Sequence, residues 1–374
     1  MFRFTFVAAL GLALALARPA VAFVSLTENF SSNPFAPAGN WSFGVGNNSN
    51  TQFVWNASTP PAYTGDATGA LNVHLNSSLP TARLQRPLGV TLTDTNNFTL
   101  TARFGFTITS APEGQNMQIA FGLVNSTLTG SNRTGTAGIY NDDDTFHTVE
   151  FDYFPNDNPW SPTLTPAVFG AQEPGLDAFG NFAWISFDLG ANINGVTNLP
   201  QNVTLQATLV YSGATKTLTL TMSQVNSNGT LTLLDTELPP LNLLGGQDVY
   251  STYDTTFPFV VDTLAIMAYQ DGYTTTNDPS LVADLQFQQL DFTTSASPPL
   301  PSYVTINIVS TNVVLAFPTV SNNLYVVQST TDLVSDAWST IASNIPGTDG
   351  VVTNMDVGGA KVSRRFYRVG LQQN

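Results

Sequence analysis

Polar and apolar residues alternate along most of the chain. The alternation is clearest over 97–108 (NFTLTARFGFTI) and 148–153 (TVEFDY), and no long segment shows the 3.6-residue period of an amphipathic helix. Residues 202–221 predict a hairpin with its turn at Ser-Gly-Ala-Thr, and further strands are expected at 118–124, 183–188, 230–234, 263–269 and 285–292. Because strand–helix–strand alternation is missing, the sequence predicts an all-β fold of antiparallel sheets.

The first 22 residues differ from the rest. They begin with one positive charge, Arg3, continue in an apolar run, and end in Ala-Val-Ala at Ala20–Ala22. This pattern is typical of a cleaved signal peptide, so we expect a secreted chain that starts at Phe23. A retained membrane anchor is the alternative, but about 14 apolar residues are too few to cross a bilayer. No later segment is apolar for long enough, so no membrane span is expected.

A second change in composition occurs at 295–302 (SASPPLPS), which is rich in proline and carries no charge. Such a segment is typical of a semi-rigid linker. It divides the mature chain into 23–294 and 303–374, and the second part has its own alternating segments. We expect a smaller fibronectin- or immunoglobulin-like sandwich there. The alternative is that these strands extend the first sandwich.

Composition narrows the choice of partner. The chain has 26 acidic and 11 basic residues, a net charge of −15, and no cysteine. A surface of this charge repels nucleic acid and anionic membranes, whereas cations and neutral ligands such as sugars remain possible. The charge also has a simpler interpretation, which is that it keeps a secreted protein soluble. The absence of cysteine excludes thiolate metal sites and cysteine catalysis.

The most informative segment for chemistry is 149–156 (VEFDYFPN). On a strand, Glu150 and Asp152 point to the same face, roughly 7 Å apart along the chain. With the carbonyl of Phe154 and the amide of Asn156, they form a set of oxygen ligands suited to Ca²⁺. The alternative is a solvated acidic strand whose carboxylates accept hydrogen bonds from turn N–H groups.

The same eight residues resemble the metal-binding strand of the legume-type lectins, within the concanavalin A-like lectin/glucanase fold. The resemblance implies a concanavalin A-like jelly-roll sandwich over 23–294. It also implies that Glu150 binds a transition metal, that Asp152 bridges this metal to Ca²⁺, and that Phe154 and Asn156 complete part of the Ca²⁺ shell. The family's downstream His is missing here, and the loop at 113–117 lacks the family's sugar-binding Asp. Ca²⁺ is therefore the only cofactor that we predict.

The fold also includes secreted β-glucanases, whose strand carries Glu-x-Asp followed by a third carboxylate. In this chain the third position falls on Phe154 or Pro155, and neither side chain can donate a proton to a leaving group. We therefore predict no catalytic residues and no glycosidase activity. His147 has no nucleophile motif near it, and we expect a structural role for it.

Sugar sites combine aromatic faces with a few polar groups that fix orientation. Trp160, in the loop after the acidic strand, is the predicted stacking residue. Asn116, in the loop 113–117, and Tyr273, in the loop 269–273, are the other predicted carbohydrate contacts. Trp184 alternates with its neighbours on a strand and is expected in the core.

The C-terminal part also resembles a known module. The segments 324–333 (LYVVQSTTDL) and 365–369 (RFYRV), with Trp338, are similar to the small C-terminal sandwich of secreted Verrucomicrobia–Planctomycetes-type bacterial proteins. The resemblance implies an attachment or spacer module and a bacterial source.

Taken together, these features predict a secreted, non-catalytic, lectin-like protein with a glycan as its partner, at the cell surface or outside the cell. A structural or adhesive surface protein is the first alternative, and a glycoside hydrolase the second. The sequence leaves the oligomeric state open.

Overall fold

The computed structural model describes most of the chain after residue 23. The described residues are 24–36, 39–45, 52–56, 69–111, 119–129, 147–155, 162–170, 182–184, 187–188, 198–234, 240–244, 258–269, 281–296, 301, 303–320, 323–333, 337–348 and 350–372. Within these ranges, no helix has the length and apolar character needed to cross a bilayer. The predicted signal peptide, 1–22, and much of the predicted linker, 295–302, lie outside them, so those boundaries stay predictions.

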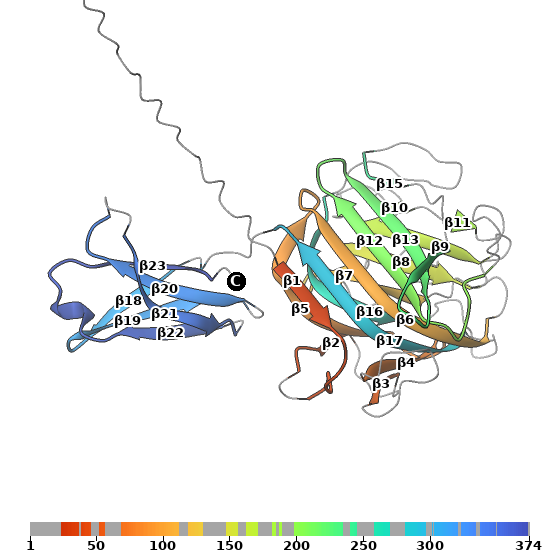
Figure 1. The fold of residues 1–374 in the computed structure, drawn as a ribbon, viewed down its shortest axis with the longest axis horizontal. Helices are drawn as coiled ribbons and strands as arrows, with labels where there is room; N and C mark the ends of the chain where they lie inside the picture. The colour runs from red at the N-terminus through yellow and green to blue at the C-terminus, as the bar shows by residue number, and fades with distance from the viewer. Residues whose placement is uncertain are drawn as a thin grey trace, which may run out of the picture.

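The larger part of the molecule consists of two antiparallel sheets (Figure 1). The first has the order β14 (Leu231–Leu233), β13 (Thr217–Val225), β12 (Leu205–Ser212), β6 (Phe98–Ser110), β17 (Val282–Thr294), β4 (Ala70–Asn76) and β3 (Phe53–Asn56), with β1 (Val24–Glu28) beside β17 and β15 (Leu241–Asn242) beside β13. The second has the order β10 (Phe182–Trp184), β9 (Thr163–Phe169), β8 (Thr148–Phe154), β7 (Ile119–Val124), β16 (Val260–Ala268), β5 (Ala82–Thr93) and β2 (Ser42–Val45), with β11 (Phe187–Asp188) beside β9.

The core lies between these two sheets. Phe104, from β6 of the first sheet, has its ring 5.6 Å from that of Phe121 and 5.9 Å from that of Phe151, which both belong to the second sheet. Alternate residues of β6 and β12 are buried in the same cluster, whereas most of the residues between them are partly or fully exposed. Burying each large apolar side chain contributes about 1.5–3 kcal/mol, so this layer is the main source of stability.

A smaller sandwich follows in the chain. Its first sheet has the order β18 (Thr305–Val309), β19 (Asn312–Pro318), β22 (Val351–Asp356), and its second has the order β21 (Ser339–Pro346), β20 (Leu324–Thr330), β23 (Phe366–Leu371). One 3₁₀ turn, Gly359–Lys361, follows β22. The smaller sandwich has a core of its own, formed by Val313, Leu315, Phe317, Tyr325, Val327 and Ile345. The predicted all-β fold class, a jelly-roll sandwich followed by a smaller sandwich, is confirmed.

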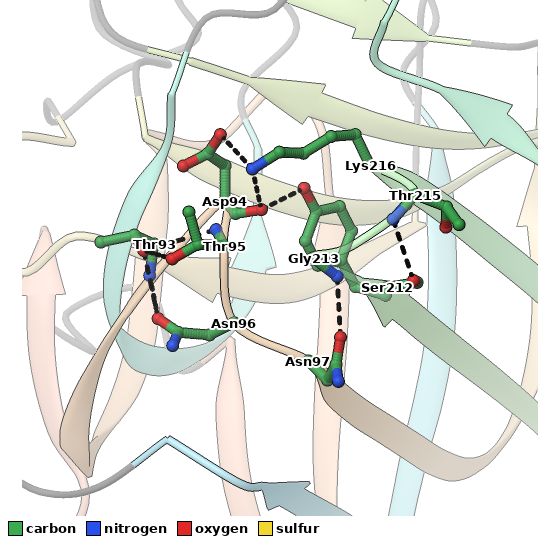
Figure 2. Close-up of polar contacts among 10 residues, drawn as sticks. Thr93, Asp94, Thr95, Asn96, Asn97, Ser212, Gly213, Thr215 and Lys216 are labelled. Carbon is green, nitrogen blue, oxygen red and sulfur yellow. Dashed lines mark hydrogen bonds and ion pairs between the residues drawn. The ribbon is translucent and has the colours of Figure 1, made fainter.

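The predicted hairpin at 202–221 is formed by β12 and β13, which pair from Leu205–Gln224 to Ser212–Thr217. Its turn is fixed against the turn between β5 and β6 (Figure 2). Lys216 donates from Nζ to the carboxylate of Asp94 (2.7 Å), and the hydroxyl of Tyr211 donates to the Asp94 carbonyl (2.8 Å). A side chain at Gly213 would collide with the carbonyl oxygen of Thr95, so close packing of the two turns requires glycine at this position.

Candidate functional site

Strand β8 places two carboxylates on the outward face of the second sheet. Val149, Phe151 and Tyr153 belong to the core between the sheets. Because side chains alternate along a strand, Glu150 and Asp152 project from the opposite face, as predicted. Both are nevertheless buried, with exposed fractions of 0% and 1%. This burial contradicts the alternative of a solvated acidic strand.

The residues opposite the two carboxylates are small. On β7, Gly122 pairs with Glu150 and Ala120 pairs with Asp152, and on β9 the partner of Glu150 is Ala167. A side chain at Gly122 would collide with the carbonyl oxygen of Val149, so β7 and β8 approach closely at this point. Ala120 also belongs to a separate apolar cluster on this face, which includes Val124, Ala265 and Met267. The carboxylates therefore lie beside an apolar floor of mostly small side chains.

Strand β5 adds two polar side chains to the same face. Arg83 pairs with Met267 on β16, Met267 pairs with Ala120 on β7, and Ala120 pairs with Asp152 on β8. Arg83 and Asp152 therefore lie in one row that crosses four strands. Gln85 occupies the corresponding place in the row of Glu150, and Arg83 donates to it from Nε (3.1 Å). Burial lowers the pKa of Arg83, and electrostatic interactions with Tyr269, Glu150 and Asp262 oppose that shift.

Sequence reasoning did not identify Arg83 as part of this site. Two features of the sequence distinguish Arg83. It is one of only five basic residues between 23 and 302, and it alternates with Leu84, which lies in the core. Neither signal reveals that a strand 67 residues before Glu150 contributes to the same face, because that depends on the pairing order of the sheet.

Arg83 is the basic side chain that the described residues place on this face, and its charge interacts with that of Glu150. The other described basic side chains of this sandwich bond elsewhere: Arg86 to Glu28 (2.6 Å), Arg103 to Gln206 (2.9 Å) and Lys216 to Asp94 (2.7 Å). Burying a carboxylate costs several kcal/mol unless an opposite charge compensates it.

The donors fit Ca²⁺ in part. Two carboxylates on one face are the hard oxygen ligands that Ca²⁺ prefers, and the full shell needs six to eight oxygens. Within the described ranges, no group of three or more His, Asp or Glu side chains converges. The next predicted ligand, Asn156, lies outside the described residues. Phe154 is buried two positions beyond Asp152, so its ring, and not a carboxylate, follows the pair on the strand.

Both histidines of the chain have other bonding partners. His147, just before β8, accepts a hydrogen bond at Nδ1 from the backbone N–H of Val260 (3.0 Å). Its own backbone N–H donates to the carbonyl of Gly170 (3.2 Å), and burial lowers the pKa of its ring. This agrees with the structural role predicted for His147. His74 lies on β4 of the other sheet, with Nδ1 2.6 Å from Asp284.

The predicted sugar contacts Trp160, Asn116 and Tyr273 lie outside the described residues, so their convergence stays a prediction. Trp184 lies on β10, but its side chain is not among the described groups. One described residue connects this region to the outward face: Tyr269, where the loop 269–273 begins, packs against the apolar cluster that contains Ala120. The loop that carries Tyr273 thus starts on the face of the carboxylate pair.

No family model matches the chain, and no curated protein matches it in sequence. Solved structures with similar folds include the carbohydrate recognition domain of Emp47p, with 13% identity over 74% of this chain and 98% of that chain and a TM-score of 0.37. Lectin I-B4 from Griffonia simplicifolia, in a metal-free form, has 14% identity over 72% and 99%, with a TM-score of 0.36. A carbohydrate esterase from the Shiga toxin-encoding bacteriophage phi24B has 13% identity over 72% and 96%, with a TM-score of 0.35. At these values, the similarity does not identify a ligand or an activity for this chain.

Proposed function

We propose that this is a secreted, non-catalytic carbohydrate-binding protein with a Ca²⁺-dependent site at the outward face of its second sheet. The observation that carries the proposal is the buried pair Glu150 and Asp152 on that face. Burying a carboxylate is costly unless an opposite charge lies near it, and Ca²⁺ bound to Glu150 and Asp152 would supply such a charge.

The burial of the two carboxylates determines their role. A side chain without exposed surface cannot contact a polysaccharide directly, so Glu150 and Asp152 hold the cation. In this proposal, Ca²⁺ also binds the carbonyl of Phe154 and the side chain of Asn156 and thereby orders the loop that follows β8. Trp160 on that loop, with Asn116 and Tyr273, then contacts the sugar.

Two further parts of the proposal rest on particular residues. Phe154 follows Asp152 where a glucanase would carry its proton donor, which supports a binding protein over a hydrolase. The segment 1–22 supports export, and the excess of acidic residues supports a neutral glycan as the partner.

The first test is a glycan array with the mature chain from Phe23, run in Ca²⁺ and again in EDTA. The expected result is glycan binding that EDTA abolishes. In parallel, Ca²⁺ should raise the melting temperature, because a ligand present at 100 times its Kd stabilises the folded state by about 2.7 kcal/mol.

Two matched variants locate the effect. Asp152→Asn keeps the shape of the side chain and removes its charge, so it should abolish both the Ca²⁺-dependent shift and the glycan binding. Asp291→Asn, on β17 of the other sheet, should leave both unchanged. Absence of glycan binding in either buffer would overturn the lectin proposal and favour a surface scaffold. Glycan binding that persists in EDTA would overturn only the proposed role of Ca²⁺ and would leave the lectin proposal in place.

A further inference from the structure

Strand β18 of the smaller sandwich is an edge strand with every residue exposed. Ile306 has an exposed fraction of 52%, Ile308 of 69% and Val309 of 55%. Tyr303, just before the strand, is also exposed. An apolar edge of this kind is unusual, because unpaired strand edges are templates for pairing with another strand.

The two isoleucines lie on the inner face of their sheet. Ile306 pairs with Leu315 and Ile308 with Val313, and both partners are buried in the core of the smaller sandwich. Ile306 and Ile308 thus extend the inner apolar face beyond the part that the opposite sheet covers. The segment 303–312 (YVTINIVSTN) contains no charged residue and no proline, which are the usual protections of an edge.

We propose that β18 pairs with β18 of a second copy of this chain, antiparallel and about a two-fold axis at Asn307. The sequence Thr-Ile-Asn-Ile-Val is nearly symmetric about that residue. The axis places Ile306 opposite Ile308 of the partner subunit and Asn307 opposite Asn307 of the partner subunit. The inner-face isoleucines of the two copies therefore lie opposite each other, and the two three-stranded sheets join into one six-stranded sheet.

The peptide groups of β18 suit this register. A two-residue turn, with Ser310 at φ 59°, joins Val309 to Asn312, so the pair that flanks the turn is hydrogen-bonded. By alternation, the peptide groups of Asn307 point toward β19, and those of Ile306 and Ile308 point away from it. In the proposed dimer, each Ile306–Ile308 pair exchanges both its backbone hydrogen bonds, and the two Asn307 residues form the close, non-hydrogen-bonded pair between them.

The contact area is compatible with a specific dimer. The exposed parts of Tyr303, Val304, Ile306, Ile308 and Val309 amount to on the order of 500 Å² per copy, so the area that two copies can bury together is at most the roughly 1,000 Å² at which specific interfaces begin. The proposal does not depend on carbohydrate binding. If both hold, the dimer carries two sugar sites, and linked sites bind a repeating polysaccharide more tightly than a single one does.

The absence of cysteine makes a sharp cross-linking test possible. In the proposed register, the Cα atoms of the two Asn307 residues lie about 4.5 Å apart, within the range that a disulfide can bridge. The two Thr305 residues lie about 13 Å apart along the strand, which is beyond that range. Asn307→Cys in the full mature chain should therefore form a disulfide dimer under mild oxidation, and Thr305→Cys, on the same strand and face, should not.

Analytical ultracentrifugation of the cysteine-free protein supplies the second readout. The wild-type chain should sediment as a dimer at micromolar concentration, and Ile308→Lys should raise the dissociation constant at least tenfold. Val357→Lys, at an apolar position of 79% exposure after β22, should remain dimeric. A wild-type chain that stays monomeric at all concentrations would overturn the proposal and leave the edge to a strand of another protein. Equal cross-linking at positions 305 and 307 would overturn the register.

Discussion

Strands β8 and β18 show the same period-two alternation and opposite burial. All seven residues of β8 are buried, including two carboxylates, whereas all five residues of β18 are exposed, including two isoleucines. Chemical character alone would predict the reverse, because charged residues are almost never fully buried and isoleucine is among the most buried residue types. The position of each strand in its sheet accounts for the difference.

β8 has a paired neighbour on each side, β7 and β9, within the eight-stranded sheet, whereas β18 pairs only with β19 at the edge of a three-stranded sheet. A central strand has its backbone groups hydrogen-bonded on both sides, and other segments of the protein can cover both of its faces. An edge strand offers one row of unpaired peptide groups whatever its side chains are. The carboxylates buried at a sheet centre and the isoleucines exposed at a sheet edge are the observations behind our two proposals, a bound cation for the first and a second strand for the other.

The comparison predicts unequal costs for truncating apolar residues in the two strands. Phe151→Ala should destabilise the larger sandwich by about 3–5 kcal/mol, because its ring is fully buried and stacks 4.8 Å from that of Phe121. Ile308→Ala should change the stability of the smaller sandwich by at most about 0.5 kcal/mol. The measurement is urea unfolding of each variant, at concentrations low enough to keep the chain monomeric. Similar costs at the two positions would show that β18 is covered within one chain.

A smaller effect is expected at the glycine opposite Glu150. Gly122→Ala should cost about 1–3 kcal/mol, because the added methyl group collides with the Val149 carbonyl and forces β7 and β8 apart. The shift of Glu150 should also weaken Ca²⁺ binding, which calorimetry would detect. Gly350→Ala is the control, since the nearest atom to its added Cβ lies 3.6 Å away, and it should be close to neutral. A neutral Gly122→Ala would show that the two strands are not held together as closely as the structure has them.

Particular residues show how far the sequence could go. Alternation predicted the strands and the shared face of Glu150 and Asp152, because a strand fixes which side each residue takes. It could not predict the burial of that face, because burial depends on what covers the sheet. Nor could it place Arg83 on the same face as the pair, since that needs the order β5–β16–β7–β8. The exposure of Ile308 has the same origin: the pattern of β18 gives no sign that the opposite sheet leaves its inner face uncovered.

The smallest expected effect concerns His147, the residue just before β8. His147 is buried, with Nδ1 accepting a hydrogen bond from Val260, and burial lowers the pKa of its ring below the ordinary value of 6.5. Protonation would remove that acceptor and place a charge in a buried site. A folded-state pKa that is lower than the unfolded one means that the unfolded chain binds the proton first. The contribution of neutral His147 to the stability of the fold is thus complete above about pH 6.5, and it is lost as the pH falls toward the pKa of this histidine in the folded state.

The melting temperature of the larger sandwich should therefore fall between about pH 6.5 and pH 5, before most carboxylates titrate. His147→Asn separates this effect from the others. Asn tolerates the left-handed backbone at this position, where φ is 57°, and it does not titrate. The variant should be less stable than the wild type at pH 7.5, because it loses the bond to Val260, and its melting temperature should change less between pH 6.5 and pH 5. An equal pH dependence in the two proteins would show that groups other than His147 cause the fall in melting temperature.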